Sequence, residues 1–217
     1  MKKLVLLLAL FALPAVAEET IGAEPASLVS AGAEASQAAK VQSFIQKLGD
    51  QVVAILGDKS LDEAGRNEKL RRVMRDTFDL PTIGKFVLGR SWQTATPDQQ
   101  KEYMRLFDKL VISIYSERFA LYSGEKMTAK TSTPQGKRDF LVISEIANPK
   151  NPNKPVKVDW RVRDFGSRLG VIDVVVEGVS MSVTQRQEYQ SVIQRNAGAI
   201  QPLLDLMKNR LEGKATD

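Results

Sequence analysis

Residues 156–163 read VKVDWRVR, and this stretch decides the class of fold. Valine or tryptophan alternates with lysine, aspartate or arginine, which is the pattern of an antiparallel strand with one face buried and the other in water. Further β-rich runs lie on either side of it, at 127–132, 138–146 and 171–176. With a loop over 148–155 and a turn over 164–168, the second half of the chain predicts an antiparallel meander.

Helical patterns flank this meander on both sides. Apolar residues recur at three- and four-residue steps in three runs before it and two runs after it, at 41–56, 70–78, 103–122, 189–193 and 200–211. This order predicts an α+β fold in which helices segregate onto an antiparallel sheet. The second of these runs also carries a basic face, which suits either a solvated surface or a contact with anionic membranes or an acidic partner: Arg66, Lys69, Arg71, Arg72 and Arg75.

Capping residues predict where several helices begin. Ser60 with Glu63 reads as a capping box, and Thr96 before Pro97 is a second start signal. Asp79 is placed to cap a short helix, and Thr184 is placed to cap the first of the two C-terminal helices.

The N-terminus has the pattern of an export signal. Lys2 and Lys3 precede a short apolar stretch, and Ala15-Val16-Ala17 fits the small-x-small rule, so cleavage is expected after Ala17. The alternative is an N-terminal anchor or core helix. No cysteine stands at the cut, so an unlipidated periplasmic protein is expected. The predicted organisation is a signal peptide, a flexible leader, one folded domain and a short tail, over 1–17, 18–35, 36–212 and 213–217.

Composition excludes several kinds of chemistry. The 217 residues suit one domain and include neither cysteine nor histidine, which excludes disulfides, the usual zinc sites, thiol catalysis and a Ser-His relay. Removing Lys2 and Lys3 lowers the formal charge from +5 to +3, which argues against a nucleic-acid role.

No catalytic constellation stands out, and neither an enzyme nor a bound metal or cofactor is expected. Asp173 and Glu177 lie four residues apart on a predicted strand, which separates them by about 13 Å and leaves them too far apart for glycoside hydrolysis. Ser180 has no histidine to activate it. For an enzyme with this architecture, the only candidate catalytic groups are Tyr103, Tyr115 and Asp173.

Three stretches of the chain carry a family resemblance. Residues 87–92 read VLGRSW and precede Ala95-Thr96-Pro97, residues 173–181 read DVVVEGVSM, and residues 185–189 read QRQEY. Their order and spacing resemble the MlaC family, also called the toluene-tolerance family, over about residues 40–212. One departure is Leu169, which stands where family members often have tryptophan before the strand.

The resemblance implies a fold and a function. The fold would be a cystatin-like or nuclear-transport-factor-like roll, a twisted antiparallel sheet wrapped by helices. The protein would be a monomeric carrier that shuttles phospholipid between an outer-membrane lipoprotein complex and an inner-membrane ABC transporter with an MCE-domain ring, and so helps to maintain outer-membrane lipid asymmetry. The alternatives are a hopanoid or other lipid carrier of the same family, an enzyme on the same roll, and a periplasmic chaperone.

Large apolar side chains are the candidates for the lipid site. Their spacing alone fits either a solid core or a cavity, and the resemblance favours the cavity. The predicted lipid-binding residues are Phe86, Leu88, Trp92, Tyr103, Phe107, Val111, Tyr115, Phe140, Val142, Trp160, Val162, Val174 and Val179.

Overall fold

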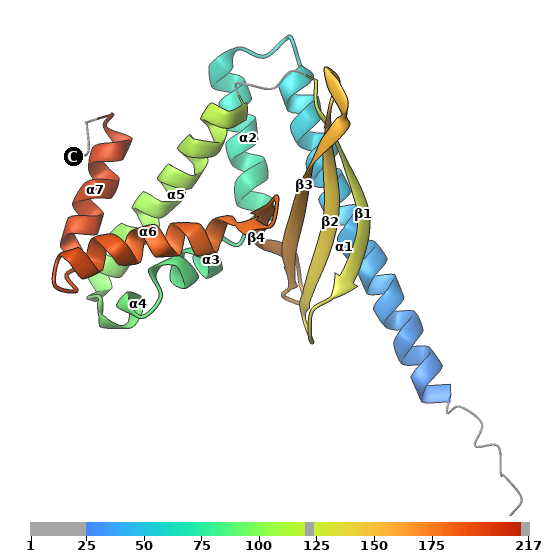
Figure 1. Cartoon of the computed structure of the whole chain (residues 1–217), viewed down its shortest axis with the longest axis horizontal. Coiled ribbons are helices and arrows are strands. Elements are labelled where there is room, and N and C mark those ends of the chain that lie inside the picture. The colour runs from blue at the N-terminus through green and yellow to red at the C-terminus, as the bar shows by residue number, and fades with distance from the viewer. Residues whose placement is uncertain (1–24, 120–123, 214–217) are drawn as a thin grey trace, which may run out of the picture.

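Helices lie on both sides of a five-stranded meander in the computed structural model, which describes residues 25–119 and 124–213 (Figure 1). The helices before the sheet are α1 (Pro25–Gly57), α2 (Glu63–Thr77), α3 (Leu80–Leu88), α4 (Ser91–Thr94) and α5 (Pro97–Phe119). The strands are β1 (Lys126–Pro134), β2 (Asp139–Asn148), β3 (Asn151–Asp164), β4 (Leu169–Val176) and β5 (Val179–Ser180), and the chain continues into α6 (Met181–Arg195) and α7 (Gln201–Leu211). The predicted α+β class is confirmed.

The sheet is an antiparallel meander in the order β1-β2-β3-β4-β5. Trp160 on β3 pairs with Val142 on β2 and with Val174 on β4. Val158 and Val162 are buried and Arg161 is exposed, as the alternating pattern predicts. Asp159 departs from the pattern, because it is buried although it alternates with the valines.

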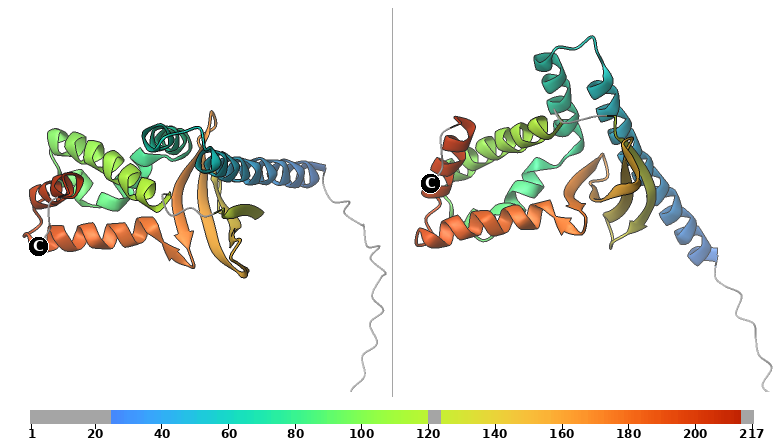
Figure 2. Two further views of the ribbon diagram at one scale, coloured as in Figure 1. Left: turned by 90° about the horizontal axis from the view of Figure 1, so that it is seen from above. Right: turned by 45° about the horizontal axis from the view of Figure 1, so that its top comes forward.

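The molecule has two apolar cores. The sheet core joins α1 to one face of β2, β3 and β4 and contains Val41, Ile45, Val142, Val162 and other buried residues. The helical core joins α3, α5, α6 and α7 around Tyr103, Leu106, Leu203 and Leu204. Figures 1 and 2 show α1 beside β1, at one edge of the sheet, and the helical group beyond β4, at the other edge. Helix α2 lies between α1 and the helical group. The predicted twisted sheet wrapped by helices is confirmed.

Two glutamines of α1 bind the outer strand of the sheet. The side-chain amide of Gln42 donates to the carbonyls of Ala129 and Lys130, both at 3.0 Å. Gln46 donates to the Met127 carbonyl at 3.2 Å and accepts from the Ala129 N–H at 2.8 Å. These bonds fix α1 against β1 where the register of β1 shifts, between Ala129 and Thr131.

The start of α1 and the hairpin between β2 and β3 differ from the sequence expectations. Helix α1 begins at Pro25 and therefore includes much of the predicted flexible leader over 18–35, although residues 32–36 are exposed. The predicted loop over 148–155 is wrong, because β3 begins at Asn151. This end of the hairpin is exposed and carries no apolar alternation by which the strand could be recognised. The predicted signal peptide over 1–17 lies outside the described residues.

Two predicted helix caps are wrong and two are confirmed. Helix α2 is capped by Asp62, whose carboxylate accepts from Gly65 N–H, because Ser60 instead bonds Asp58 in the preceding turn. Helix α6 is capped by Ser180 and not by Thr184, whose hydroxyl donates back to the Ser180 carbonyl. The caps at Asp79 and Thr96 are confirmed.

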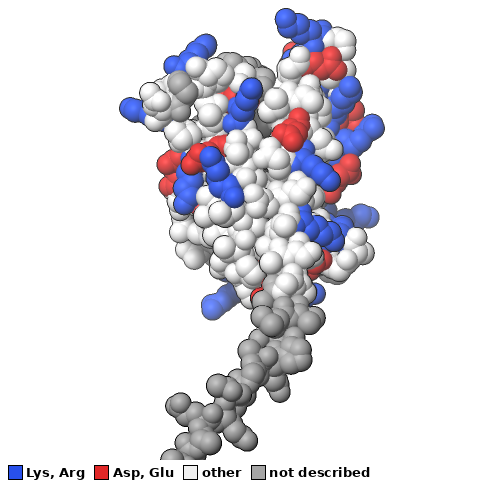
Figure 3. Space-filling model, turned by 90° about the vertical axis from the view of Figure 1, so that its right-hand side faces the viewer, with Lys and Arg blue, Asp and Glu red and all other residues white. Residues whose placement is uncertain are grey.

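The side of the molecule that carries α1 shows charges of both signs. In Figure 3 lysine and arginine side chains are interspersed with aspartate and glutamate over this face. On the basic face of α2, Lys69 pairs with Asp58 at 3.8 Å and Arg75 pairs with Asp108 at 3.1 Å. Part of that basic face is therefore neutralised within the chain.

Asp79 connects the helices to the sheet. Its carboxylate accepts from Thr82 N–H at 2.8 Å and forms an ion pair with Arg168, which lies in the turn between β3 and β4. The Asp79 N–H donates to the Val171 carbonyl at 2.9 Å. Burial alone would raise the pKa of Asp79, but the bonds from Thr82 and the Arg168 guanidinium outweigh it and lower that pKa below its usual value.

Asp79→Asn is expected to lower the free energy of unfolding by about 1–2 kcal/mol at neutral pH. Asparagine still caps the helix, so the change isolates the carboxylate charge. A lowered folded-state pKa stabilises the fold above the unfolded-state pKa of about 3.9, and this contribution is lost as pH falls through the folded value. Urea unfolding of both proteins from pH 7 to pH 2 should therefore show a difference that shrinks in acid.

Asp62→Asn is the matched control, because Asp62 also caps a helix but is exposed and forms no ion pair in the described structure. We expect it to change stability little at any pH. A difference between Asp79→Asn and the unaltered protein that stays constant down to pH 2 would contradict the role of the charge.

Candidate functional site

Two hollows lie between the helices and the sheet. The first, named here the sheet cavity, has a volume of about 440 Å³ and lies between α1, α2 and the sheet. Its walls are almost wholly apolar and include Leu48, Val52, Val53, Leu56, Leu70, Val73, Met74, Met127, Ile146, Val158 and Trp160. The second, named the helix cavity, has a volume of about 340 Å³ and lies between α3, α5, α6, α7 and β4.

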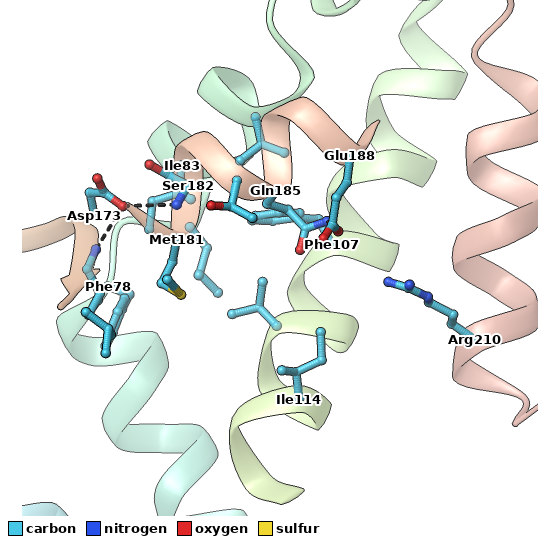
Figure 4. Close-up of a pocket in the computed structure, with 16 residues that line it drawn as sticks. Phe78, Ile83, Phe107, Ile114, Asp173, Met181, Ser182, Gln185, Glu188 and Arg210 are labelled. Atoms are coloured by element: carbon cyan, nitrogen blue, oxygen red, sulfur yellow. Dashed lines mark hydrogen bonds between the residues drawn. The ribbon is translucent and has the colours of Figure 1, made fainter. Parts of the chain in front are cut away.

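The helix cavity is lined by both apolar and polar side chains, and in Figure 4 Asp173 and Ser182 lie at the end opposite Arg210. The apolar lining from α3 and α5 includes Ile83, Val87, Phe107, Val111 and Ile114. Along α6 and α7 its lining is polar and includes Thr184, Gln185, Glu188 and Arg210. The cavity is therefore amphipathic: Phe107 and Val87 are buried apolar residues, Asp173 and Ser182 are buried polar residues, and Glu188 and Arg210 are exposed.

The two hollows share one wall. Phe78, Val174 and Val176 line both. Phe78 lies just after α2 and meets the Trp160 ring edge-on, with ring centroids 6.5 Å apart. A ligand that extends past Phe78 would find apolar side chains on both sides of it.

The polar atom of Trp160 is satisfied by the sheet. Its indole N–H donates to the Ser144 hydroxyl at 2.9 Å, and that hydroxyl donates to the Val158 carbonyl at 2.7 Å. Because the N–H is already bonded, Trp160 presents only apolar surface to the sheet cavity.

Asp173 fixes the start of α6 beside the helix cavity. Its buried carboxylate accepts from the N–H of Val174 at 2.9 Å and of Ser182 at 3.0 Å, and from the Ser180 hydroxyl at 2.6 Å. Ser182 is the second residue of α6, so the carboxylate satisfies one of the free N–H groups at the helix start. Asp173 is thus fully engaged in structure.

Of the other two candidate catalytic groups, Tyr103 is engaged in structural contacts. Tyr103 lies in the helical core, fully buried, and donates from its hydroxyl to the Gly84 carbonyl at 3.0 Å. Burial, reinforced by Tyr189, raises the pKa of Tyr103. The side chain of Tyr115 lies outside the described part of the structure.

Some of the predicted lipid-binding residues line the two hollows. Phe107 and Val111 on α5 line the helix cavity, Trp160 lines the sheet cavity, and Val174 lines both. They come from α5, β3 and β4, and the fold brings them to two adjoining hollows.

The remaining predicted residues lie elsewhere. Leu88, Tyr103 and Trp92 belong to or pack against the helical core, whereas Val142, Val162 and Phe140 belong to the sheet core. Phe86 is 42% exposed and Val179 is 53% exposed. Phe86 and Phe140 border a third hollow of about 330 Å³, whose lining also contains Asp139, Arg161 and Arg163.

Sequence reasoning did not assign the cavity walls from α1 and α2. Leu48, Val52 and Leu56 belong to the apolar stripe of α1, and Leu70, Val73 and Met74 to that of α2. A stripe indicates burial but does not distinguish a packed neighbour from a hollow. Phe78, at the end of the second stripe, also lines both hollows.

Potential metal ligands are not clustered in the part of the chain that the structure describes. No group of three or more aspartate, glutamate, histidine or cysteine residues is gathered there in a way that could hold a metal ion.

Among the described helices, none combines the length and the apolar composition needed to cross a bilayer.

Fold and site together define an α+β protein whose antiparallel sheet and helical layer enclose adjoining apolar hollows. The family model described as "MlaC protein" matches residues 46–209, and the chain belongs to this family. The resemblance found in the sequence motifs is thereby confirmed.

Similar proteins include a curated relative and a protein of solved structure. The toluene tolerance protein ttg2D of Pseudomonas putida is 20% identical over 139 residues, and the match spans 64% of this chain and 64% of that relative, less than two thirds of its length. A phospholipid-binding protein of Ralstonia solanacearum, solved in complex with a phospholipid, is 25% identical with a TM-score of 0.67. That match covers 79% of this chain and 97% of the solved chain.

Proposed function

We propose that this protein binds phospholipid in the two hollows and carries it through the periplasm. It would shuttle between an outer-membrane lipoprotein complex and an inner-membrane ABC transporter with an MCE-domain ring, and so help to maintain lipid asymmetry in the outer membrane. The observation that carries the proposal is the apolar region formed by the sheet and helix cavities around Phe78. The phospholipid complex of the similar Ralstonia solanacearum protein supports the same ligand class.

The energetics of lipid transfer explain what such a carrier must supply. Each methylene exposed to water costs about 0.8 kcal/mol, so the roughly 25–30 methylenes of a two-chain lipid cost on the order of 20 kcal/mol. An apolar cavity removes most of this cost if its walls are dry. The lining of the sheet cavity supports such a role, because it comes almost entirely from apolar side chains of α1, α2 and the sheet.

The shared wall suggests how two chains would be placed. One acyl chain would occupy the sheet cavity and the other the apolar part of the helix cavity, with Phe78, Val174 and Val176 between them. The headgroup would remain at the polar, exposed end of the helix cavity.

A carrier needs no catalytic group, and two polar side chains at the hollows, Asp173 and Trp160, are engaged in structural hydrogen bonds. The proposed activity is therefore binding without chemical change of the lipid. An enzyme on the same architecture would release a product of altered mass, and a chaperone would carry no lipid.

Protein purified from its own periplasm is expected to carry intact phospholipid, because bare acyl chains would otherwise contact water. Native mass spectrometry of the purified protein, followed by lipid extraction, gives the number and mass of bound molecules and separates a phospholipid from a hopanoid. The protein should also accelerate exchange of a fluorescent phospholipid between donor and acceptor vesicles in proportion to its concentration.

Vesicles mixed without protein give the background rate of exchange. Protein that carries no lipid and leaves this rate unchanged would contradict the proposed function. A bound lipid whose mass changes during incubation would favour the enzyme.

A further inference from the structure

The open end of the helix cavity carries two opposite charges. Glu188 on α6 and Arg210 on α7 both line the cavity and are both exposed, whereas Phe107 and Val174 in the same lining are buried. Exposure therefore marks the end with Glu188 and Arg210 as the mouth of the cavity. In Figure 4 the Arg210 guanidinium extends from α7 toward the carboxylate of Glu188.

Neither of these charges forms an ion pair with a residue that the structure describes. Glu188 accepts a hydrogen bond from the Gln185 side chain at 3.0 Å but forms no ion pair in the described structure. Arg210 likewise has no ion pair with a described residue. Its neighbour Lys208 differs, because it pairs with Glu102 at 2.8 Å and with Asp205 at 3.7 Å.

The other polar side chains near the mouth have partners within the fold. Thr184 donates to the Ser180 carbonyl at 2.9 Å, and the Asp173 carboxylate is bonded to Ser180 and Ser182. Both charges also act on the nearby Tyr189 phenol: burial raises the pKa of Tyr189 to about 12, while Arg210 lowers it and Glu188 raises it. The mouth thus offers one cation and one anion to a ligand.

We infer that Arg210 and Glu188 form a headgroup site that selects a phosphodiester carrying a primary ammonium group, as in phosphatidylethanolamine. This inference rests on the proposed function. The planar guanidinium would bind two phosphate oxygens at once, a geometry that favours arginine over lysine. The Glu188 carboxylate would accept hydrogen bonds from the ammonium group, which a short ethylene link holds near the phosphate.

Headgroups differ in whether they offer a binding partner to both Arg210 and Glu188. A phosphatidylglycerol headgroup has a phosphate for Arg210 but only hydroxyls for Glu188, and its net negative charge is repelled by that carboxylate. A choline headgroup has a cation without N–H donors. Since the mouth is exposed and screened by salt, we expect a preference of about three- to tenfold and not a larger one.

The test is competitive loading of the delipidated protein. Vesicles contain equal parts of phosphatidylethanolamine and phosphatidylglycerol with the same acyl chains, and native mass spectrometry gives the ratio of the two lipids bound. The unaltered protein should favour phosphatidylethanolamine. Glu188→Gln should lower the ratio about three- to tenfold, whereas Arg210→Gln should reduce the loading of both lipids by a similar factor.

Two control variants make the same changes in charge at residues outside the mouth. Lys208→Gln removes a positive charge from α7, and Asp205→Asn removes a negative one, and neither residue lines the cavity. Both are expected to keep the lipid ratio and the loading of the unaltered protein. If they reproduced the effects of Arg210→Gln and Glu188→Gln, net charge and not the mouth would set the preference, and the proposal would be overturned.

Soluble glycerophosphoethanolamine distinguishes a lipid headgroup from a free phosphodiester. Without acyl chains it should compete weakly, and tight Arg210-dependent binding of this compound would overturn a headgroup site. A loaded protein whose lipid ratio is unchanged by Glu188→Gln would overturn the headgroup site alone. Failure of the unaltered protein to load any phospholipid would overturn both this site and the proposed function.

Discussion

Val111→Glu is expected to give a folded protein that no longer carries phospholipid. Val111 lies in the middle of α5, half-buried, and faces the helix cavity. In the empty cavity water can solvate the new carboxylate, so the cost to folding is small. An acyl chain would have to displace that water and bury the charge, which costs several kcal/mol, so lipid binding should fall by more than tenfold. Circular dichroism reports folding and native mass spectrometry reports bound lipid.

The preceding residue provides the control. Leu110 is buried in the helical core and does not line either hollow, so Leu110→Glu places the same charge where water cannot enter. That cost is several kcal/mol against a total stability of about 5–15 kcal/mol, and we expect this variant to unfold. If Val111→Glu also unfolds, α5 packs against a solid core at Val111. A folded Val111→Glu protein with its full complement of lipid would show that acyl chains do not reach this wall.

Asp173→Ala is expected to lower the free energy of unfolding by about 2–4 kcal/mol. The change removes the acceptor for the Ser180 hydroxyl and for the Ser182 N–H and leaves both polar groups without their partner at a buried site. It also removes the hydrogen bonds that link β4 to the start of α6, and α6 forms one wall of the helix cavity. Denaturant unfolding of the lipid-free protein measures the loss directly.

Asp173→Asn separates shape from hydrogen bonding in this network. The amide has almost the same size and keeps one oxygen that can accept from Ser182 N–H, so about half of the loss is expected. Two variants with stabilities within about 0.5 kcal/mol of the unaltered protein would show that water replaces the carboxylate without cost.

The fold was predictable because its elements carry local patterns. The alternation at 156–163 reports a strand with one buried face, and Val158 and Val162 are buried as that pattern requires. The Asp79 and Thr96 caps are also local, since each bonds an N–H group three residues away. By contrast, the exposed start of β3 has no buried face, and its proline and asparagine residues predicted a loop where a strand lies.

The walls of the hollows were only partly predictable. On α5 the residues Leu110 and Val111 are adjacent and both apolar, yet the first is buried in the helical core and the second lines a cavity. Periodicity predicts which residues are buried. Whether a buried residue packs against another side chain or lines a hollow depends on how far apart the elements lie. Phe86 shows the opposite error of pattern reading, because this large aromatic residue is 42% exposed and the Arg186 guanidinium lies over its ring.

The glutamines of α1 also have a consequence for crowded solutions of this protein. An outermost strand normally offers a row of free carbonyl and N–H groups on which a second molecule can polymerise. Along β1, the carbonyls of Met127, Ala129 and Lys130 are already occupied by Gln42 and Gln46. A second copy would have to displace both amides before it could pair with this part of β1. Helix α1 therefore opposes edge-to-edge aggregation here.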